Sequence, residues 1–428
     1  MNLIDNPSPA QWPALTQRPA IPRANLESDV RTIMEAVRRE GDAAVLRYTA
    51  QFDRAQLDAS AVPAQAFADA KTAVSPELRA AISLARDNIT RFHRPAAAVE
   101  ATETTPGVRC WARKVAIERV GLYIPGGTAP LFSTLLMLGV PALQAGCREI
   151  VVCTPPAPDG SVHPAILYTA ELLGLKRVYR VGGVQAVAAM TFGTAEVPRV
   201  DKIFGPGNQY VTCAKELAQG FGVAIDMPAG PSEVLVIADE SAEPEFVAAD
   251  LLSQAEHGAD SQVMLLSDSA AVLAECLAAV ERQLEALPRR EMAAGAIQNS
   301  KAVLLPDLKA CMAFSNAYAP EHLILALGDA EDWAGAVTNA GSVFLGNYSC
   351  ESAGDYASGT NHTLPTNGFA RNYSGVSVDS FCKRITFQQL SATGIRNLGP
   401  AIEVMAEAEG LFAHKNAVTI RLNALQNT

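Results

Sequence analysis

The sequence predicts an α/β protein in which a Rossmann-like nucleotide domain is combined with a second α/β layer, an N-terminal arm and a C-terminal helical tail. Three observations support this prediction. Short β-branched runs alternate with helical segments over most of the 428 residues, which is typical of βαβ units. The chain is longer than a single core usually accommodates. Its two ends differ in pattern from the middle.

The N-terminal arm is predicted from its prolines. Five of them lie between Pro7 and Pro22, where they block helix formation and leave an extended segment with Leu3, Ile4 and Trp12 as its apolar residues. Such a segment needs another surface to lie on.

Helical periodicity begins after the arm. Apolar residues recur at i, i+3, i+4 and i+7 from Val30 to Val37, and a second helix is expected from about Glu77 to His93. A further α/β alternation follows residue 238, and we expect the N-terminal helices to cover its outer face. Its helices are expected at Glu245–His257 and Ser269–Leu287, and its strands at Gln262–Leu266, Ala302–Leu305 and Ser342–Leu345.

The middle of the chain carries the signature of a parallel sheet. Its expected strands are Val120–Ile124, Ile150–Cys153, Val178–Val181, Lys202–Phe204 and Val223–Ile225, with a further run at Val234–Ile237. Three of them precede glycine-rich turns at Pro125-Gly126-Gly127, Gly182-Gly183 and Gly205-Pro206-Gly207. None matches G-x-G-x-x-G, so each alone is more simply an ordinary strand-to-helix turn. Three on one sheet edge favour a nucleotide site.

Composition excludes several classes of protein. The net charge is −11 and no basic stripe is present, which argues against a nucleic-acid partner. The most apolar stretch, Leu131–Ala145, is too short and too interrupted to span a membrane. The N-terminus lacks secretory features, and the eight cysteines form no CxxC pair. We therefore expect reduced thiols and a cytoplasmic protein.

Four histidines lie in polar strings that indicate chemistry. Gln254 and His257 are i, i+3 at a helix end, so two potential ligands project from one face. Taken alone, the pair is more simply explained as the polar cap of a helix. Glu321 and His322 are adjacent before an apolar run. Neighbours in an extended segment point apart, which suits two roles: His322 as proton acceptor and Glu321 as activator of a water. The alternative is an exposed polar loop.

The other two strings complete a candidate metal site. Asp355 and His362 belong to a glycine-punctuated loop, and Glu409 and His414 belong to the tail. Gln254, His257, Asp355 and His414 together would make a set of two nitrogens and two oxygens, which suits zinc, manganese or cobalt. Without thiolates, such a set is typical of an open catalytic site.

The sequence closely resembles the histidinol dehydrogenase family through essentially the whole chain. The most specific blocks are Ile225–Glu233 and Ser253–His257. The resemblance implies zinc on Gln254, His257, Asp355 and His414, and acid/base work by Glu321 and His322. It implies substrate contacts from Ser232, His362 and Glu409, with the zinc ligands and the acid/base pair also around the substrate. NAD contacts carry over to Tyr123, Gln185 and Asn208.

The resemblance also implies a reaction and an assembly. The expected reaction is the zinc-dependent oxidation of L-histidinol to L-histidine through the aldehyde with two NAD, at the end of histidine biosynthesis. A relative acting on another amino or sulfonated alcohol is the alternative. A binding protein without turnover would leave Glu321 and His322 without a purpose.

The implied architecture is a homodimer with exchanged ends, in which every active site is shared. Two incomplete Rossmann-like domains are expected, the first built from segments on either side of the second. The expected segments are the arm at residues 1–21, the first domain at 22–122 with 238–376, the NAD domain at 123–237, and the tail at 377–428.

Overall fold

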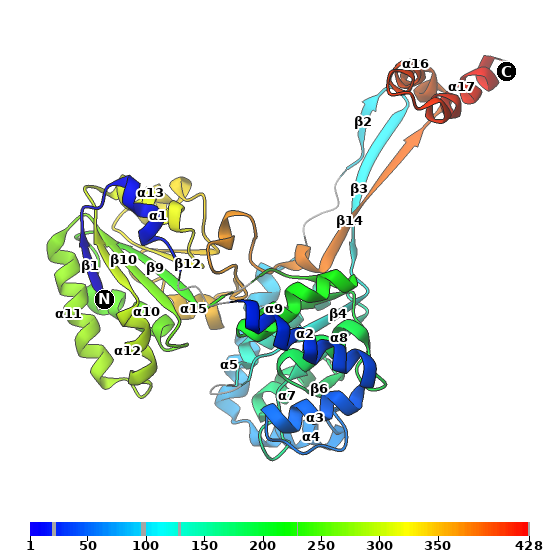
Figure 1. Ribbon diagram of the computed structural model, residues 1–428. Coiled ribbons are helices and arrows are strands. Elements are labelled where there is room, and N and C mark those ends of the chain that lie inside the picture. The colour runs from blue at the N-terminus through cyan, green and yellow to red at the C-terminus, as the bar shows by residue number, and fades with distance from the viewer. Residues whose placement is uncertain (19–22, 96–99, 127–129, 229, 427–428) are drawn as a thin grey trace. The chain divides into compact units, whose positions relative to one another are not determined.

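The computed structural model describes residues 1–18, 23–95, 100–126, 130–228 and 230–426. The chain divides into two compact units, which are described separately (Figure 1). Unit 1 comprises Met1–Arg94 with Ile117–Ser380, and unit 2 comprises Pro95–Ala116 with Phe381–Thr428. In the described part of the chain, no helix is both long and apolar enough to cross a membrane.

One parallel sheet of unit 1, the β4 sheet, has the strand order β6-β5-β4-β7-β8. This is the Rossmann order without its sixth strand. Its strands are β4 (Arg119–Tyr123), β5 (Glu149–Thr154), β6 (Val178–Arg180), β7 (Lys202–Phe204) and β8 (Ala224–Ile225). Its helices are α6 (Phe132–Ala145), α7 (Pro164–Leu172), α8 (Gly183–Phe192) and α9 (Gln209–Ala218).

The second parallel sheet, the β9 sheet, repeats this order as β11-β10-β9-β12-β13 and gains β1 beside β11. Its strands are β1 (Asn2–Asp5), β9 (Glu233–Ala238), β10 (Gln262–Ser267), β11 (Lys301–Leu304), β12 (His322–Ala326) and β13 (Ser342–Leu345). Its helices are α10 (Pro244–Ala255), α11 (Ala270–Ala286), α12 (Arg290–Gln298), α13 (Leu308–Tyr318), α14 (Ala330–Trp333) and α15 (Glu351–Tyr356). Side chains alternate along β9: Val234 packs in the core with α10 to α12, and Leu235 in the core with α13. The α/β class with parallel sheets is thus confirmed.

The N-terminal helices cover a different sheet from the one expected. They are α2 (Arg23–Glu40), α3 (Asp42–Phe52), α4 (Ala64–Ala73) and α5 (Pro76–Phe92). They pack against the helices of the β4 sheet, where Met34 and Val37 share a core with Val187 of α8. The expectation that they cover the later α/β layer is therefore wrong, because helical periodicity identifies a buried face without identifying what buries it.

The two sheets also divide the chain at residues other than 122/123 and 237/238. β4 begins at Arg119, and the run at Val234–Ile237 is the central strand β9 of the other sheet. Buried strands of both sheets have the same apolar composition, so composition could not show to which sheet the run belongs.

The arm lies on its own chain. β1 pairs in parallel with β11, with Asn2 opposite Lys301, and a short turn at Pro9–Gln11 leads into α1 (Trp12–Leu15). The Trp12 and Phe314 rings pack in a T-shaped arrangement with their centroids 5.4 Å apart. The arm thus finds the surface that it was expected to need, and its exchange between subunits stays a prediction.

Unit 2 is an antiparallel sheet with a helical hairpin. β3 (Val108–Ala116) pairs with β2 (Thr102–Thr105) on one side and along its full length with β14 (Cys382–Leu390) on the other. α16 (Ala392–Ala408) and α17 (Phe412–Gln426) then pack on each other. The helical tail was expected from the sequence, but the three strands were not.

Candidate active site

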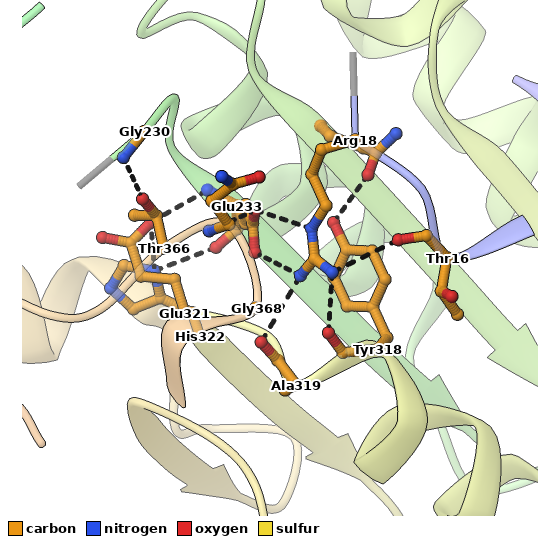
Figure 2. A network of polar contacts seen from close by, with 12 residues as sticks. Thr16, Arg18, Gly230, Glu233, Tyr318, Ala319, Glu321, His322, Thr366 and Gly368 are labelled. Carbon is orange, nitrogen blue, oxygen red and sulfur yellow. Dashed lines mark hydrogen bonds and ion pairs between the residues drawn. The ribbon is translucent and has the colours of Figure 1, made fainter. Parts of the chain in front are cut away.

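The site forms where β9 and β12 begin. Glu321 precedes β12, His322 is its first residue, and both are buried. The backbone N–H of Glu233, the first residue of β9, donates to Glu321 Oε2 at 2.9 Å, and its carbonyl lies 3.1 Å from His322 Nδ1 (Figure 2). The expectation that the two side chains point apart is wrong, because both turn toward the same β9 residue. Glu321 Oε2 and His322 Nδ1 are 3.6 Å apart.

Burial and charge perturb both groups strongly. Burial raises the pKa of Glu321 to about 8, against the opposing influence of His322. Burial alone would lower the pKa of His322, but the carboxylates of Glu321, Asp355 and Glu351 outweigh it and raise that pKa to about 10. Three carboxyl groups therefore surround the imidazole, and carboxyl oxygens together with an imidazole nitrogen are suitable ligands for a cation.

Two buried oxygens at this point are unpartnered among the described residues. Gln254, in the last turn of α10, donates its Nε2 to the Glu233 carbonyl at 3.2 Å, and its Oε1 has no hydrogen-bond partner. Asp355 Oδ1 also lacks a hydrogen bond and lies 3.5 Å from His322 Nε2. Buried acceptors in this state are costly unless a ligand satisfies them. A cation that takes nitrogen and oxygen ligands fits here.

Glu351 is a site residue that the sequence analysis did not single out. Single atoms of His322, Glu351 and Asp355 lie within 4.8 Å of one another, close enough to share a metal ion. The interval 350–362 was expected to be a loop, but α15 forms there and places Glu351 and Asp355 at i and i+4 on one helix face. That spacing was the signal available in the sequence. Burial raises the pKa of Glu351 to about 8.

A cavity of about 820 Å³ joins these groups to other predicted residues. Its lining from the predicted site comprises Asn208, Ser232, Gln254, His257, Glu321, His322, Asp355 and His362. His362 is held from two sides, with Nδ1 2.9 Å from the Asp355 carbonyl and Nε2 3.0 Å from the Thr134 hydroxyl. The structure thus gathers most of the predicted site around one cavity in unit 1.

The predicted NAD residues lie on neighbouring turns at the carboxyl edge of the β4 sheet. Tyr123 ends β4, and its hydroxyl accepts from the Gly183 N–H at 3.2 Å. Gln185 is buried in α8, with Nε2 3.5 Å from an Asp53 oxygen. Asn208 caps α9 by accepting from two backbone N–H groups, and only Asn208 of the three lines the cavity. Gly127 of the first glycine turn lies outside the described residues.

Two predicted residues belong to unit 2. Glu409 directly follows α16, and His414 lies within α17. Their roles at the site of unit 1 stay predictions.

These features define a class of protein: an α/β protein whose Rossmann-type sheet edge opens onto a cavity with a buried carboxylate–imidazole centre suited to a metal ion. The family model described as histidinol dehydrogenase matches residues 16–422. The chain is 58% identical to the histidinol dehydrogenase of Bacteroides thetaiotaomicron over 427 residues, covering 100% of each chain. It is 54% identical to that of Xanthomonas axonopodis over 415 residues, covering 96% of each.

A solved structure agrees with these sequence matches. The histidinol dehydrogenase of Elizabethkingia anophelis superposes with a TM-score of 0.97 at 57% identity, covering 100% of this chain and 99% of the other. The chain belongs to the histidinol dehydrogenase family.

Proposed function

We propose that this protein is an enzyme that oxidises L-histidinol to L-histidine through the aldehyde, with two NAD and one zinc ion per site, as a cytoplasmic enzyme of histidine biosynthesis. One observation carries the proposal: a buried Glu321–His322 pair lies beside two oxygens, of Gln254 and Asp355, that have no hydrogen-bond partner among the described residues. The cavity that contains them reaches two of the three glycine turns, at Pro125 and at Pro206-Gly207. Family membership supports it.

Zinc would be held by Gln254, His257 and Asp355 of unit 1 and by His414. The oxygen donors Gln254 Oε1 and Asp355 Oδ1 fit this role because no hydrogen bond occupies either of them among the described residues. Bound zinc would hold the amine and imidazole nitrogens of the substrate and supply a positive charge that offsets the surrounding carboxylates.

The protein's own residues then divide the proton transfers. His322 Nδ1 lies 3.1 Å from the Glu233 carbonyl and 3.0 Å from Gln254 Nε2, whereas Nε2 of His322 has no hydrogen-bond partner among the described residues. The positive charge of bound zinc would lower the pKa of His322, so that Nε2 of the neutral ring accepts the hydroxyl proton during alcohol oxidation. The second oxidation consumes water, and Glu321 is the base for that water because its raised pKa suits proton abstraction near neutral pH. His322 acts again on the hydrated aldehyde.

The remaining predicted residues orient the reactants. NAD, bound against Tyr123, Gln185 and Asn208, would accept one hydride in each oxidation. Ser232 and His362 would contact the substrate, and Glu409 would complement its cationic amine or imidazole. His362 and Glu409 argue against the alternative substrate, another amino or sulfonated alcohol, because both residues fit a substrate that carries an imidazole and a positive charge.

We also propose a homodimer in which His414 serves the site of the partner subunit. Large apolar side chains on the helices of unit 2 are exposed in the single chain, among them Val404 at 68%, Met405 at 65% and Phe412 at 63%. Such side chains need cover, and a twofold dimer covers both tails at once. The His322→Ala and His414→Ala variants, refolded as a mixture, should give heterodimers with about half of wild-type activity. Inactive heterodimers beside a well-refolded wild type would contradict the shared site.

Steady-state NADH formation tests the proposed function. Histidinol should produce NADH at a rate far above that with other amino alcohols or sulfonated diols, and chelation should abolish the rate until zinc is restored. Faster turnover of another alcohol would replace the substrate assignment. Unchanged turnover after verified metal removal would contradict the zinc assignment.

A further inference from the structure

Arg18, at the end of the N-terminal arm, reaches the residue that organises the site. Its Nε and one terminal nitrogen, NH2, bind the two carboxylate oxygens of Glu233 at 2.9 and 2.8 Å, which is a bidentate ion pair. The pair is buried, with side-chain exposures of 10% and 2%. Figure 2 shows the guanidinium between this carboxylate and the Tyr318 ring, whose centroid lies 3.6 Å from Arg18 Cζ.

The same guanidinium binds the segment that leads into β12. It donates to the Tyr318 carbonyl at 2.8 Å and to the Ala319 carbonyl at 3.4 Å. Ala319 has a φ of +56°, a conformation that a non-glycine residue adopts only when its surroundings hold it. Arg18 therefore joins the beginnings of β9 and β12 from a third element of the fold.

Glu233 in turn contacts three residues of the proposed site through its backbone. Its N–H donates to Glu321, and its carbonyl lies within 3.2 Å of both Gln254 Nε2 and His322 Nδ1. The carboxylate of Glu233 faces away from these groups and is bound by Arg18 and by the Asn367 N–H at 2.8 Å. The backbone position of Glu233 is thus fixed through its own side chain.

We propose that Arg18 is a positioning residue, which through Glu233 holds the proton-transfer pair and the zinc ligand Gln254 in their working geometry. This inference rests on the proposed function for the identity of the reaction and the metal. A bidentate arginine suits the role because its planar fork fixes both distance and orientation. Displacement of a catalytic group by about 1 Å can cost about 100-fold in rate.

The test compares Arg18→Met and Arg18→Lys with the control Arg282→Met. The control removes Arg282 from its ion pair with Glu245. The side chains of Arg282 and Glu245 are 61% and 49% exposed, and neither residue lines the cavity. Zinc affinity is measured by competition with a chromogenic chelator. Turnover of histidinol and of the supplied aldehyde is then measured per zinc-loaded site, and thermal melting confirms folding.

We expect Arg18→Met to lower kcat about 100-fold in both half-reactions. The KM for NAD should stay within about twofold, because Arg18 lines the same cavity as Gly207 but makes its hydrogen bonds to Thr16, Glu233, Tyr318 and Ala319. Zinc affinity should fall about tenfold, because the Glu233 carbonyl that accepts from the ligand Gln254 is no longer held in place. Arg18→Lys keeps the positive charge but cannot form the two parallel hydrogen bonds to the Glu233 carboxylate, so its kcat should lie between those of wild type and Arg18→Met. Arg282→Met should match wild type.

Rescue adds a readout that a purely structural role would not give. Ethylguanidinium ion should restore part of the activity of Arg18→Ala and have no effect on wild type. If Arg18→Met does not fold, the positioning role is tested by the kcat and zinc affinity of Arg18→Lys and by the rescue of Arg18→Ala. Wild-type kcat and zinc affinity in folded Arg18→Lys, together with no rescue of Arg18→Ala, would overturn the proposal.

The two proposals fail differently. If the wild type did not oxidise histidinol but Arg18→Lys still weakened zinc binding, the proposed function would be contradicted and the positioning role would still be supported.

Discussion

The glycine turn after β7 is held by a buried ion pair, and breaking that pair should weaken both folding and NAD binding. Lys215 Nζ lies 2.5 Å from Asp226 Oδ1 and donates to the Gly205 carbonyl at 2.7 Å, while the Gly205 N–H donates to Asp226 Oδ2 at 2.8 Å. Both backbone groups of Gly205 are thus bound by one ion pair. A side chain at Gly205 would clash with the Tyr123 carbonyl, and the φ of Gly205 is +127°, so this position of the turn requires glycine.

Substituting Lys215 by Met leaves the buried Asp226 carboxylate without its ion-pair partner. The two side chains are 3% and 1% exposed, and loss of one partner from such a pair costs about 3–5 kcal/mol. The N–H groups of Gly205 and Met227 still bind the carboxylate, so we expect about 3 kcal/mol. The double variant Lys215→Met/Asp226→Asn buries no charge and should recover at least half of that loss.

Urea unfolding and NAD titration together check this reasoning. Lys215→Met should unfold at a lower urea midpoint and show a KM for NAD about tenfold higher, with the KM for histidinol within about twofold of wild type. A loss below about 1 kcal/mol, or a double variant less stable than Lys215→Met, would refute the account of the buried pair. Equal rises in both KM values would refute its specific effect on the NAD turn.

Three further perturbations are expected to act as follows. Glu321→Gln should slow aldehyde oxidation by about 100-fold or more and alcohol oxidation much less, because only aldehyde oxidation consumes water. His322→Ala should slow both oxidations. Equal losses in the two oxidations for Glu321→Gln would contradict the role of Glu321 as the base for water. His257→Ala should lose zinc and activity together, so a full metal content by elemental analysis would count against this ligand. Burial raises the pKa of Asp250 to about 6, so the folded state retains a proton that the unfolded state releases between about pH 4 and 6, and stability falls as the pH rises through that window. Asp250→Asn has no carboxyl to ionise and can still accept from the Glu351 N–H. It should therefore be more stable than wild type by about 1–2 kcal/mol at pH 8 and by little at pH 4. Equal stability at pH 8 would contradict the raised pKa of Asp250.

Periodicity and turn chemistry were sufficient to predict most strands and helices. The expected run at Lys202–Phe204 coincides with β7, and the glycine turns after β4, β6 and β7 do share one sheet edge. Periodicity could not assign β9 to a sheet or the N-terminal helices to a face, because a buried apolar run carries no information on its partner. The hairpin at 102–116 pairs with β14, almost three hundred residues later, which local pattern cannot reveal.

The candidate site was predicted in its residue types more fully than in its geometry. The polar strings around Gln254, Glu321 and Asp355 stood out because an apolar core would not accept them unpaired. The site nevertheless lies at the amino ends of β9 and β12, whereas ligand sites in open parallel sheets are expected at the carboxyl ends of the strands. The contribution of Arg18 depends on a tertiary contact with Glu233, more than two hundred residues away, whereas Glu351 could have been found from its i, i+4 spacing to Asp355.

The number of NADH molecules formed per histidinol tests the central claim most directly. A limiting amount of histidinol is converted completely with excess NAD, NADH is measured by absorbance, and the products are separated. The account predicts two NADH and one histidine for each histidinol, because the site contains both a hydroxyl-proton acceptor and a base for water. One NADH per histidinol, with free aldehyde accumulating, would contradict it.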